Sequence, residues 1–231
     1  YAQMNNYDSS LVRISLTYDK SAGQLVDFEV EAIDNYLLNQ TDETINTIIS
    51  TYADDPDYTS FIGEVLTVSQ NDYGRYDMVQ WGASVVRDYA GVDIGAVNAG
   101  GFRVSMDAGD VTMGELITIY PFDNVIKTSE MTCLQIQNFY IEIMNNGDDV
   151  VFDDALSYNS VTERVEINGV PIELGTYYTV GAVDYIFDKT YYDFLDGRDI
   201  QQTIYYMRDL LAMDLRNAED GFNPYDGTHI E

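Results

Sequence analysis

The chain has 231 residues, enough for one large domain or two small ones, and its apolar content of 45% with 20 Tyr argues against disorder. Forty Asp and Glu against 11 Lys and Arg give a net charge of −29, a field that repels nucleic acid polymers and anionic membrane surfaces. One Cys excludes an intrachain disulfide, and one His is insufficient for a His-based metal centre or a Ser-His pair. The acid-rich segments 54–57 and 148–154 lack the EF-hand spacing, and we interpret them as loops.

The first predicted elements are a β-hairpin and a helix. Residues 11–17 and 24–33 alternate between apolar and polar side chains around a turn at 21–23, which predicts two antiparallel strands. Thr41 is the predicted N-cap of a helix that ends at residues 54–56, where a proline follows two aspartates. Apolar side chains recur at helical spacing within it, at Ile45, Ile48, Ile49 and Tyr52.

A second helix is predicted at about residues 77–89, after a short strand within 61–69. Met78 and Trp81 lie on one side of this helix with other apolar residues. Large apolar side chains on one helical face are usually part of the core, and we expect both residues to be buried.

A buried strand at residues 92–97 is followed abruptly by a polar turn at 98–103. The Asn98 amide can both donate and accept, and Arg103 presents a planar fork of donors. Gly100 and Gly101 allow the backbone to approach a ligand closely. Such a turn at the end of a strand is where open α/β sheets bind ligands. On this segment alone, a plain loop in which Asn98 and Arg103 only hold the backbone is the favoured interpretation.

Two capping boxes predict the next two helices. Thr112 with Glu115 begins a short helix that ends near residues 120–122, and Thr132 with Gln135 begins a helix that ends at 145–147. A strand at 124–128 lies between them. Cys133 falls in the first turn of the later helix, where we interpret it as a structural thiol.

The last third of the chain begins with strands. Asn168-Gly169 lies between two apolar runs and is the strongest short hairpin signal in the sequence. Residues 176–182 form another predicted strand, and Asp199 is the predicted cap of a final helix that continues through Leu215. The pattern predicts a single α/β (α+β) domain over residues 41–231, with the hairpin of residues 1–40 as the leading edge of the same domain.

Taken in this order, the motifs resemble the C-terminal domain of the 5′-nucleotidase family. The residues that carry the resemblance are 98–103, Pro121-Phe122, the helix from Thr132, the hairpin at 168–171 and the strand at 177–180. The resemblance extends from about Leu11 to the end of the chain. It implies a mixed sheet flanked by helices, with an N-terminal hairpin.

The resemblance also implies an activity divided between two domains. In the family, an N-terminal metallophosphoesterase domain holds two divalent metal ions, and the C-terminal domain binds the nucleotide. This chain is then the substrate-binding half of a secreted or cell-surface phosphohydrolase, with no cofactor of its own and no hydrolytic activity alone. Its expected partners are a small-molecule nucleotide or nucleoside and the N-terminal domain, but no nucleic acid polymer and no membrane.

The residues implied in substrate binding are Arg75, Asn98, Gly100, Gly101, Arg103, Phe122 and Tyr185. Phe122 and Tyr185 would stack on the two faces of the base, a contact that depends little on base identity. Asn98 would contact the base, while Arg103 and Arg75 would contact the sugar and other polar groups. Without the resemblance, the two aromatic residues are more often core residues, and Arg75 is more often a partner of surface acids.

Two departures from the family pattern favour a competing hypothesis. Ala99 stands where the family has its second glycine, and residues 188–193 read Asp-Lys-Thr-Tyr-Tyr-Asp where the family has a Gly-Gly-Asp-Gly-aromatic run. The alternative is a non-catalytic acidic surface module that keeps the fold and has lost the nucleotide pocket. An open slot between Phe122 and Tyr185, with Asn98 and Arg103 at its rim, would distinguish the two hypotheses.

Overall fold

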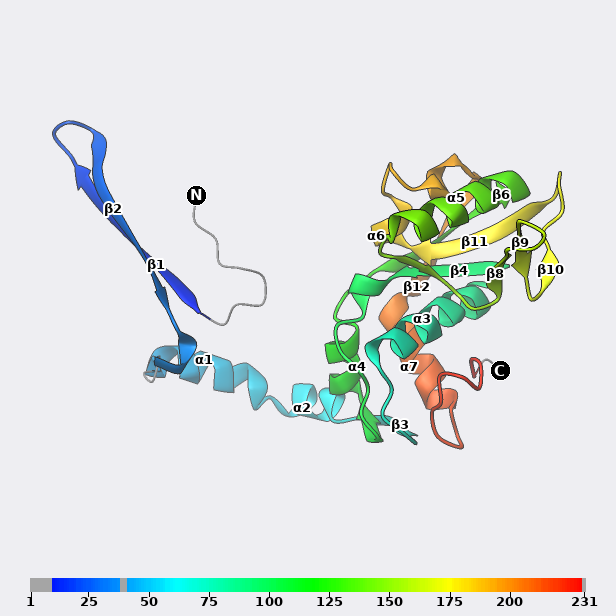
Figure 1. The fold of residues 1–231 in the computed structure, drawn as a ribbon. Coiled ribbons are helices and arrows are strands. Elements are labelled where there is room, and N and C mark those ends of the chain that lie inside the picture. Colours follow the sequence, from blue (N-terminus) through cyan, green and yellow to red (C-terminus); the bar gives the residue numbers. More distant parts are fainter. Residues whose placement is uncertain (1–9, 38–40, 230–231) are drawn as a thin grey trace. The chain divides into compact units, whose positions relative to one another are not determined.

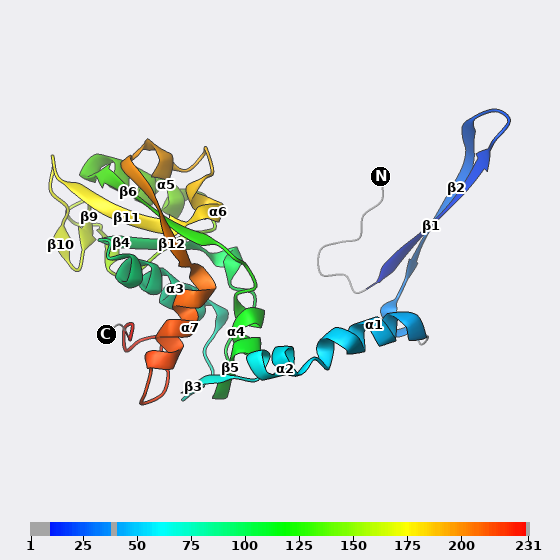
Figure 2. The same ribbon diagram turned by 180° about the vertical axis from the view of Figure 1, so that it is seen from behind.

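The computed structural model describes residues 10–37 and 41–229. The chain divides into two compact units, Tyr1–Asp55 and Pro56–Glu231 (Figures 1 and 2). This division falls after the first long helix, whereas the sequence predicts a boundary between residues 40 and 41. That the hairpin belongs to the same domain as the rest of the chain stays a prediction.

The first unit contains the predicted hairpin, formed by β1 (Leu11–Asp19) and β2 (Gln24–Ile33), then η1 (Asn35–Leu37) and α1 (Glu43–Ala53). The N-cap of α1 is Asp42, one residue after the predicted Thr41, because the Asp42 carboxylate accepts the backbone N–H groups of Thr44 and Ile45.

The two faces of the hairpin differ in polarity. Directly opposed residues share a face, and the register places Ile14 opposite Val30 and Leu16 opposite Phe28. The other face pairs Ser15 with Glu29 and Arg13 with Glu31. The four apolar side chains named here are exposed, with Leu16 and Phe28 each 64% exposed. The hairpin therefore has an apolar face that no described residue of the first unit covers.

The second unit begins with α2 (Pro56–Ile62), β3 (Val65–Ser69), α3 (Arg75–Ala90), β4 (Ile94–Asn98), η2 (Ala99–Gly101), β5 (Gly109–Thr112), α4 (Met113–Ile119), β6 (Val125–Thr132) and α5 (Cys133–Asn146). It continues with β7 (Val150–Phe152), β8 (Leu156–Asn159), β9 (Arg164–Ile167), β10 (Val170–Pro171), β11 (Tyr177–Val183), α6 (Asp184–Phe187), η3 (Asp193–Asp196), β12 (Arg198–Tyr206) and α7 (Met207–Asn217).

A five-stranded mixed sheet is the centre of this unit, with the strand order β12-β6-β11-β4-β7. The β11–β4 pair is parallel and the other pairs are antiparallel. Gly95 and Gly181 face α3, and Phe152 on the other face contacts Phe139 of α5, so the two helices cover opposite faces (Figure 1). The mixed sheet flanked by helices that the resemblance implies is confirmed.

Several local predictions are confirmed in this unit. Both capping boxes form, at Thr112 and at Thr132. Asn168 and Gly169 both have positive φ angles, as a tight two-residue hairpin turn requires, and they connect β9 to β10. Trp81 is 1% exposed, and its indole N–H donates to the buried Asp214 carboxylate at 2.7 Å.

The predicted helix from Asp199 is wrong in its first half. Residues 198–206 form strand β12, which pairs with β6 at the edge of the sheet, and only α7 is helical. Ile200 and Ile204 match a helical spacing, but residues 203–206 read Thr-Ile-Tyr-Tyr, a run of β-branched and aromatic residues that favours a strand. Pairing with the open edge of β6 therefore makes residues 198–206 a strand.

Gly95 and Gly181 are register partners in β4 and β11, and they provide a matched test of how closely α3 packs on the sheet. A Cβ at Gly95 would lie 2.1 Å from the Ala83 carbonyl oxygen, whereas a Cβ at Gly181 would lie 3.1 Å from a Val92 methyl group. Gly95→Ala should lower the free energy of unfolding by about 3 kcal/mol, and Gly181→Ala by about 1 kcal/mol or less, in urea denaturation. Equal effects would contradict this packing.

Candidate functional site

The turn after β4 is held by Arg75, the first residue of α3. Its Nε donates to the Phe102 carbonyl, and its Nη2 donates to the Ala99 carbonyl at 2.6 Å. The sequence offered two roles for Arg75, contact with a sugar or a pair with a surface acid. In the structure its guanidinium binds the main chain of the turn, so Arg75 is a positioning residue for residues 98–103.

Close contacts favour glycine at both positions of the turn, more strictly at Gly101. A Cβ at Gly101 would lie 2.9 Å from the Tyr120 ring, and a Cβ at Gly100 would lie 3.1 Å from the Asp149 carboxylate. The Gly100 N–H donates to that carboxylate at 2.9 Å, and the Ala99 N–H donates to the Asp149 carbonyl at 2.8 Å. The turn is therefore held from one side by Arg75 and from the other by Asp149.

Arg103 is unusual in this acidic chain because it has no carboxylate partner. Five of the eight arginines form ion pairs, namely Arg13, Arg87, Arg198, Arg208 and Arg216. Among the described residues, none offers Arg103 a carboxylate within ion-pair distance, and its Nη1 donates to the Gly100 carbonyl at 3.0 Å. The remaining N–H groups of its guanidinium are available to a ligand.

Phe122 and Tyr185 come from segments far apart in the chain. Tyr185 lies in α6, directly after β11, and Asn98 ends β4. Because β4 and β11 are parallel neighbours, their carboxyl ends reach the same edge of the sheet. Phe122 follows α4 and is 42% exposed, and Tyr185 is 53% exposed. Neither ring is packed in the core.

One pocket of about 240 Å³ collects these groups. It is lined by Asn98, Gly100, Arg103, Phe122, Asn124, Asp149 and Tyr185, which we call the aromatic pocket. Five of the seven residues implied by the resemblance line it. Gly101 lies buried behind it, and Arg75 contacts the turn without lining the pocket.

Two lining residues, Asn124 and Asp149, were not identified from the sequence. The Asn124 Oδ1 accepts the Tyr120 hydroxyl at 2.8 Å, and its Nδ2 donates to Asp184 at 2.7 Å. Burial raises the pKa of the Tyr120 hydroxyl, and the nearby Asp184 raises it further, so this hydroxyl stays a donor. The Asn124 amide is thereby oriented, with one N–H and one lone pair left for a ligand.

The atypical segment 188–193 lies beside the aromatic pocket and does not line it. The Lys189 ammonium lies 4.5 Å from the centre of the Tyr185 ring. It lines a neighbouring cavity together with Asp184, Tyr185 and Asp188, and Asp188 forms an ion pair with Lys127 at 2.7 Å. The segment therefore contacts Tyr185 through Lys189, and none of its residues lines the aromatic pocket.

Other candidate sites on the chain have plain structural explanations. Within residues 10–37 and 41–229, no group of three or more His, Cys, Asp or Glu side chains could hold a metal ion. Cys133 is buried in the first turn of α5, and burial raises the pKa of its thiol. Among the described helices, none is both long enough and apolar enough to cross a membrane.

Comparisons with known proteins agree with this architecture. A putative 5′-nucleotidase from Staphylococcus aureus, solved in complex with alpha-ketoglutarate, matches 91% of this chain and 48% of its own, with a TM-score of 0.65 and 14% identity. A 5′-nucleotidase precursor from Thermus thermophilus matches 91% of this chain and 47% of its own, with a TM-score of 0.59 and 18% identity. At these identities the likeness shows the fold.

The sequence comparisons show the family. The trifunctional nucleotide phosphoesterase protein YfkN of Bacillus subtilis (strain 168) is 33% identical over 60 residues, which are 26% of this chain and 4% of that protein. The chain thus spans a small part of this relative and about half the length of the two solved 5′-nucleotidases. The family model described as "5′-nucleotidase, C-terminal domain" matches residues 53–196, more than half of the chain, and the chain therefore belongs to this family.

Proposed function

We propose that the aromatic pocket binds the nucleoside part of a nucleotide. The observation that carries the proposal is one pocket lined by two half-exposed rings, Phe122 and Tyr185, together with Arg103, which has no carboxylate partner among the described residues. A base stacks between the rings, and the amides of Asn98 and Asn124 contact its edge. Arg103 and Asp149 supply a donor and an acceptor for sugar hydroxyls.

The size of the pocket supports this assignment. Pockets that bury a whole drug-sized ligand usually measure about 300–1,000 Å³. A pocket of about 240 Å³ is just below that range, so it encloses a base while the phosphate end of the ligand extends outward. The competing surface module requires a filled slot, which makes the nucleoside assignment the better supported of the two.

If the base stacks between the two rings, removing either ring should weaken nucleoside binding measurably. Phe122→Ala and Tyr185→Ala should each weaken adenosine binding by about 1–3 kcal/mol, or roughly 5- to 150-fold, in isothermal titration calorimetry. Tyr158→Ala, which removes a half-exposed tyrosine from β8, is the matched control and should leave the affinity unchanged. Absence of heat and of NMR chemical-shift changes with both adenosine and AMP at millimolar concentration would contradict the proposed nucleoside binding.

We infer further that the parent protein is a secreted or cell-surface phosphohydrolase whose two divalent metal ions reside in another domain. The relatives are longer than this chain, and no described cluster of side chains here fits a metal ion. The role of this chain is then to bind the nucleotide and present its phosphate to those metals.

If the metal ions reside in another domain, this chain alone should not hydrolyse nucleotides. A preparation free of contaminating phosphatases should release no phosphate from AMP above the buffer rate, with or without added Mg²⁺, Mn²⁺ or Zn²⁺. Colorimetric phosphate release measures this. Metal-dependent turnover that survives repeated purification would contradict the proposal.

We propose that the apolar face of the hairpin, formed by Ile14, Leu16, Phe28 and Val30, packs against the metal-binding domain of the parent protein. Contiguous exposed apolar surface usually marks an interaction site. In the isolated chain this face should bind the dye ANS, and the double variant Leu16→Thr with Phe28→Thr should lower the dye fluorescence. Threonine keeps the strand preference of the positions while removing most of the apolar area.

The matched control changes an opposed pair on the other face, Ser15→Thr with Glu29→Gln, and should leave the fluorescence unchanged. Equal dye fluorescence from the native chain and the Leu16→Thr, Phe28→Thr variant would show that the dye does not bind the hairpin, and would contradict the proposed exposed apolar face.

A further inference from the structure

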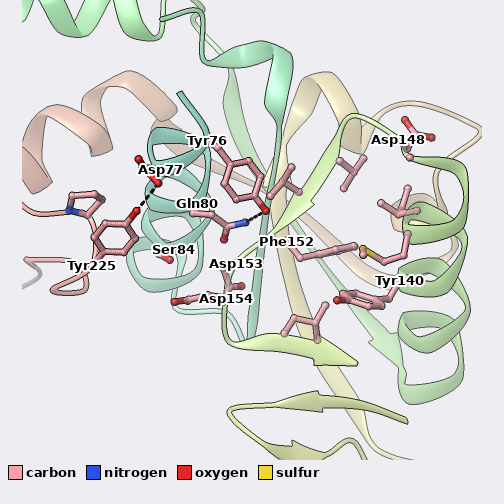
Figure 3. Close-up of a pocket in the computed structure, with 17 residues that line it drawn as sticks. Tyr76, Asp77, Gln80, Ser84, Tyr140, Asp148, Phe152, Asp153, Asp154 and Tyr225 are labelled. Carbon is pink, nitrogen blue, oxygen red and sulfur yellow. Dashed lines mark hydrogen bonds between the residues drawn. The ribbon is translucent and has the colours of Figure 1, made fainter. Parts of the chain in front are cut away.

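A second cavity, of about 520 Å³, lies at the β7 edge of the sheet, between α3 and α5 (Figure 3). Its lining comes from α3, from α5 with the loop after it, from β7 with the turn that follows, and from the C-terminal segment at Pro224 and Tyr225. It shares no lining residue with the aromatic pocket. The proposed nucleoside binding therefore leaves this cavity without a role.

The charged groups of this cavity are all acidic. Asp77, Asp148, Asp153 and Asp154 line it, and no Lys, Arg or His does. The fully buried Asp153 is neutralised by Arg87, at 2.6 Å, and accepts two backbone N–H groups. Asp154 lies 3.8 Å from the same Arg87, and no described residue gives Asp77 or Asp148 a cation within ion-pair distance. A cation in the cavity would be attracted and an anion repelled.

Tyrosine hydroxyl groups contact two of these carboxylates. Tyr225 donates its hydroxyl to Asp77, and Tyr192 donates its hydroxyl to Asp148, each at 2.5 Å. Asp77 also accepts the Gly74 N–H, and Asp148 accepts the Asp149 N–H, each at 2.7 Å. Two of about four acceptor positions on each carboxylate are therefore used, and the others are open to a ligand.

The walls of the cavity are apolar and aromatic. The rings of Tyr76 from α3, Tyr140 from α5 and Phe152 from β7 line it, with Ile143 and Met144 beside them (Figure 3). Aromatic faces attract organic cations, and apolar walls bury an alkyl stem. A bare metal ion gains nothing from such walls.

Gln80 provides an unused acceptor in the same cavity. Its Nε2 donates to the Tyr76 hydroxyl at 3.0 Å (Figure 3). Its Oε1 is buried and has no hydrogen-bond partner among the described residues. A buried acceptor without a partner is costly, and a ligand N–H group would remove that cost.

We propose that this cavity is a second ligand site, and that its ligand is an alkylammonium, an organic amine with an apolar stem. The ammonium group donates to Gln80 Oε1 within the negative field of the lining carboxylates, and the stem packs against Tyr76, Tyr140 and Phe152. Carboxylate and phosphate ligands are excluded by the lining charge.

The proposal is tested by titrating the full chain with pentylammonium chloride at constant ionic strength, followed by ¹H–¹⁵N NMR. Saturable shifts are expected at the amides of Gln80, Ser84 and Phe152. Pentanol, which has the stem without the charge, and ammonium chloride, which has the charge without the stem, should each bind at least tenfold more weakly. Equal binding of pentanol, or shifts spread over the surface without saturation, would overturn the proposal.

A charge-matched pair of variants separates the cavity from the general acidity of the chain. Gln80→Glu should strengthen pentylammonium binding at least threefold, and Gln80→Leu should weaken it at least threefold. Gln202→Glu adds the same charge on β12, at the opposite edge of the sheet, and should leave the affinity unchanged. Equal strengthening by both Glu variants would show that the overall field binds the amine and would overturn the proposal.

Adenosine binding serves as an independent readout on the same samples. It should be unaffected by Gln80→Glu and Gln80→Leu, because the two pockets share no lining residue. Absence of adenosine binding in every sample would contradict the proposed nucleoside site and leave the amine result unaffected. Failure of the nucleoside proposal is therefore distinguishable from failure of the alkylammonium proposal.

Discussion

The parallel pairing of β4 and β11 is the contact on which the aromatic pocket depends. Both strands run toward the same edge, so their ends bring Asn98 and Tyr185 together although 87 positions separate them in the numbering. Gly95 and Gly181 lie opposite each other in this pair and leave room for the α3 backbone. The close packing of α3 in turn places Arg75 against the carbonyl groups of the turn.

Much of this arrangement could be predicted from local sequence because the signals are local in origin. Thr112 and Thr132 cap helices through contacts within four residues, and Asn168-Gly169 closes a two-residue turn. The turn at 98–103 was identifiable because an Asn, two glycines and an Arg directly follow a buried strand. The order of these motifs then indicated the family.

The errors and omissions arise where distant contacts decide the outcome. Residues 198–206 form a strand because β6 offers an edge, which no spacing of Ile200 and Ile204 reveals. Asn124 directly precedes β6, and only its bonds to Tyr120 and Asp184 show that its amide is oriented for recognition. The role of Arg75 was missed for the same reason, since its acceptors lie 24 and 27 residues away.

The loop after α5 has a consequence that follows from two adjacent residues. Asp148 lines the cavity between α3 and α5, while Asp149 lines the aromatic pocket and holds its turn. One short loop therefore contributes a carboxylate to each of the two pockets. A substitution that shifts the backbone of this loop should change both pockets, whereas Gln80 on α3 belongs to only one of them.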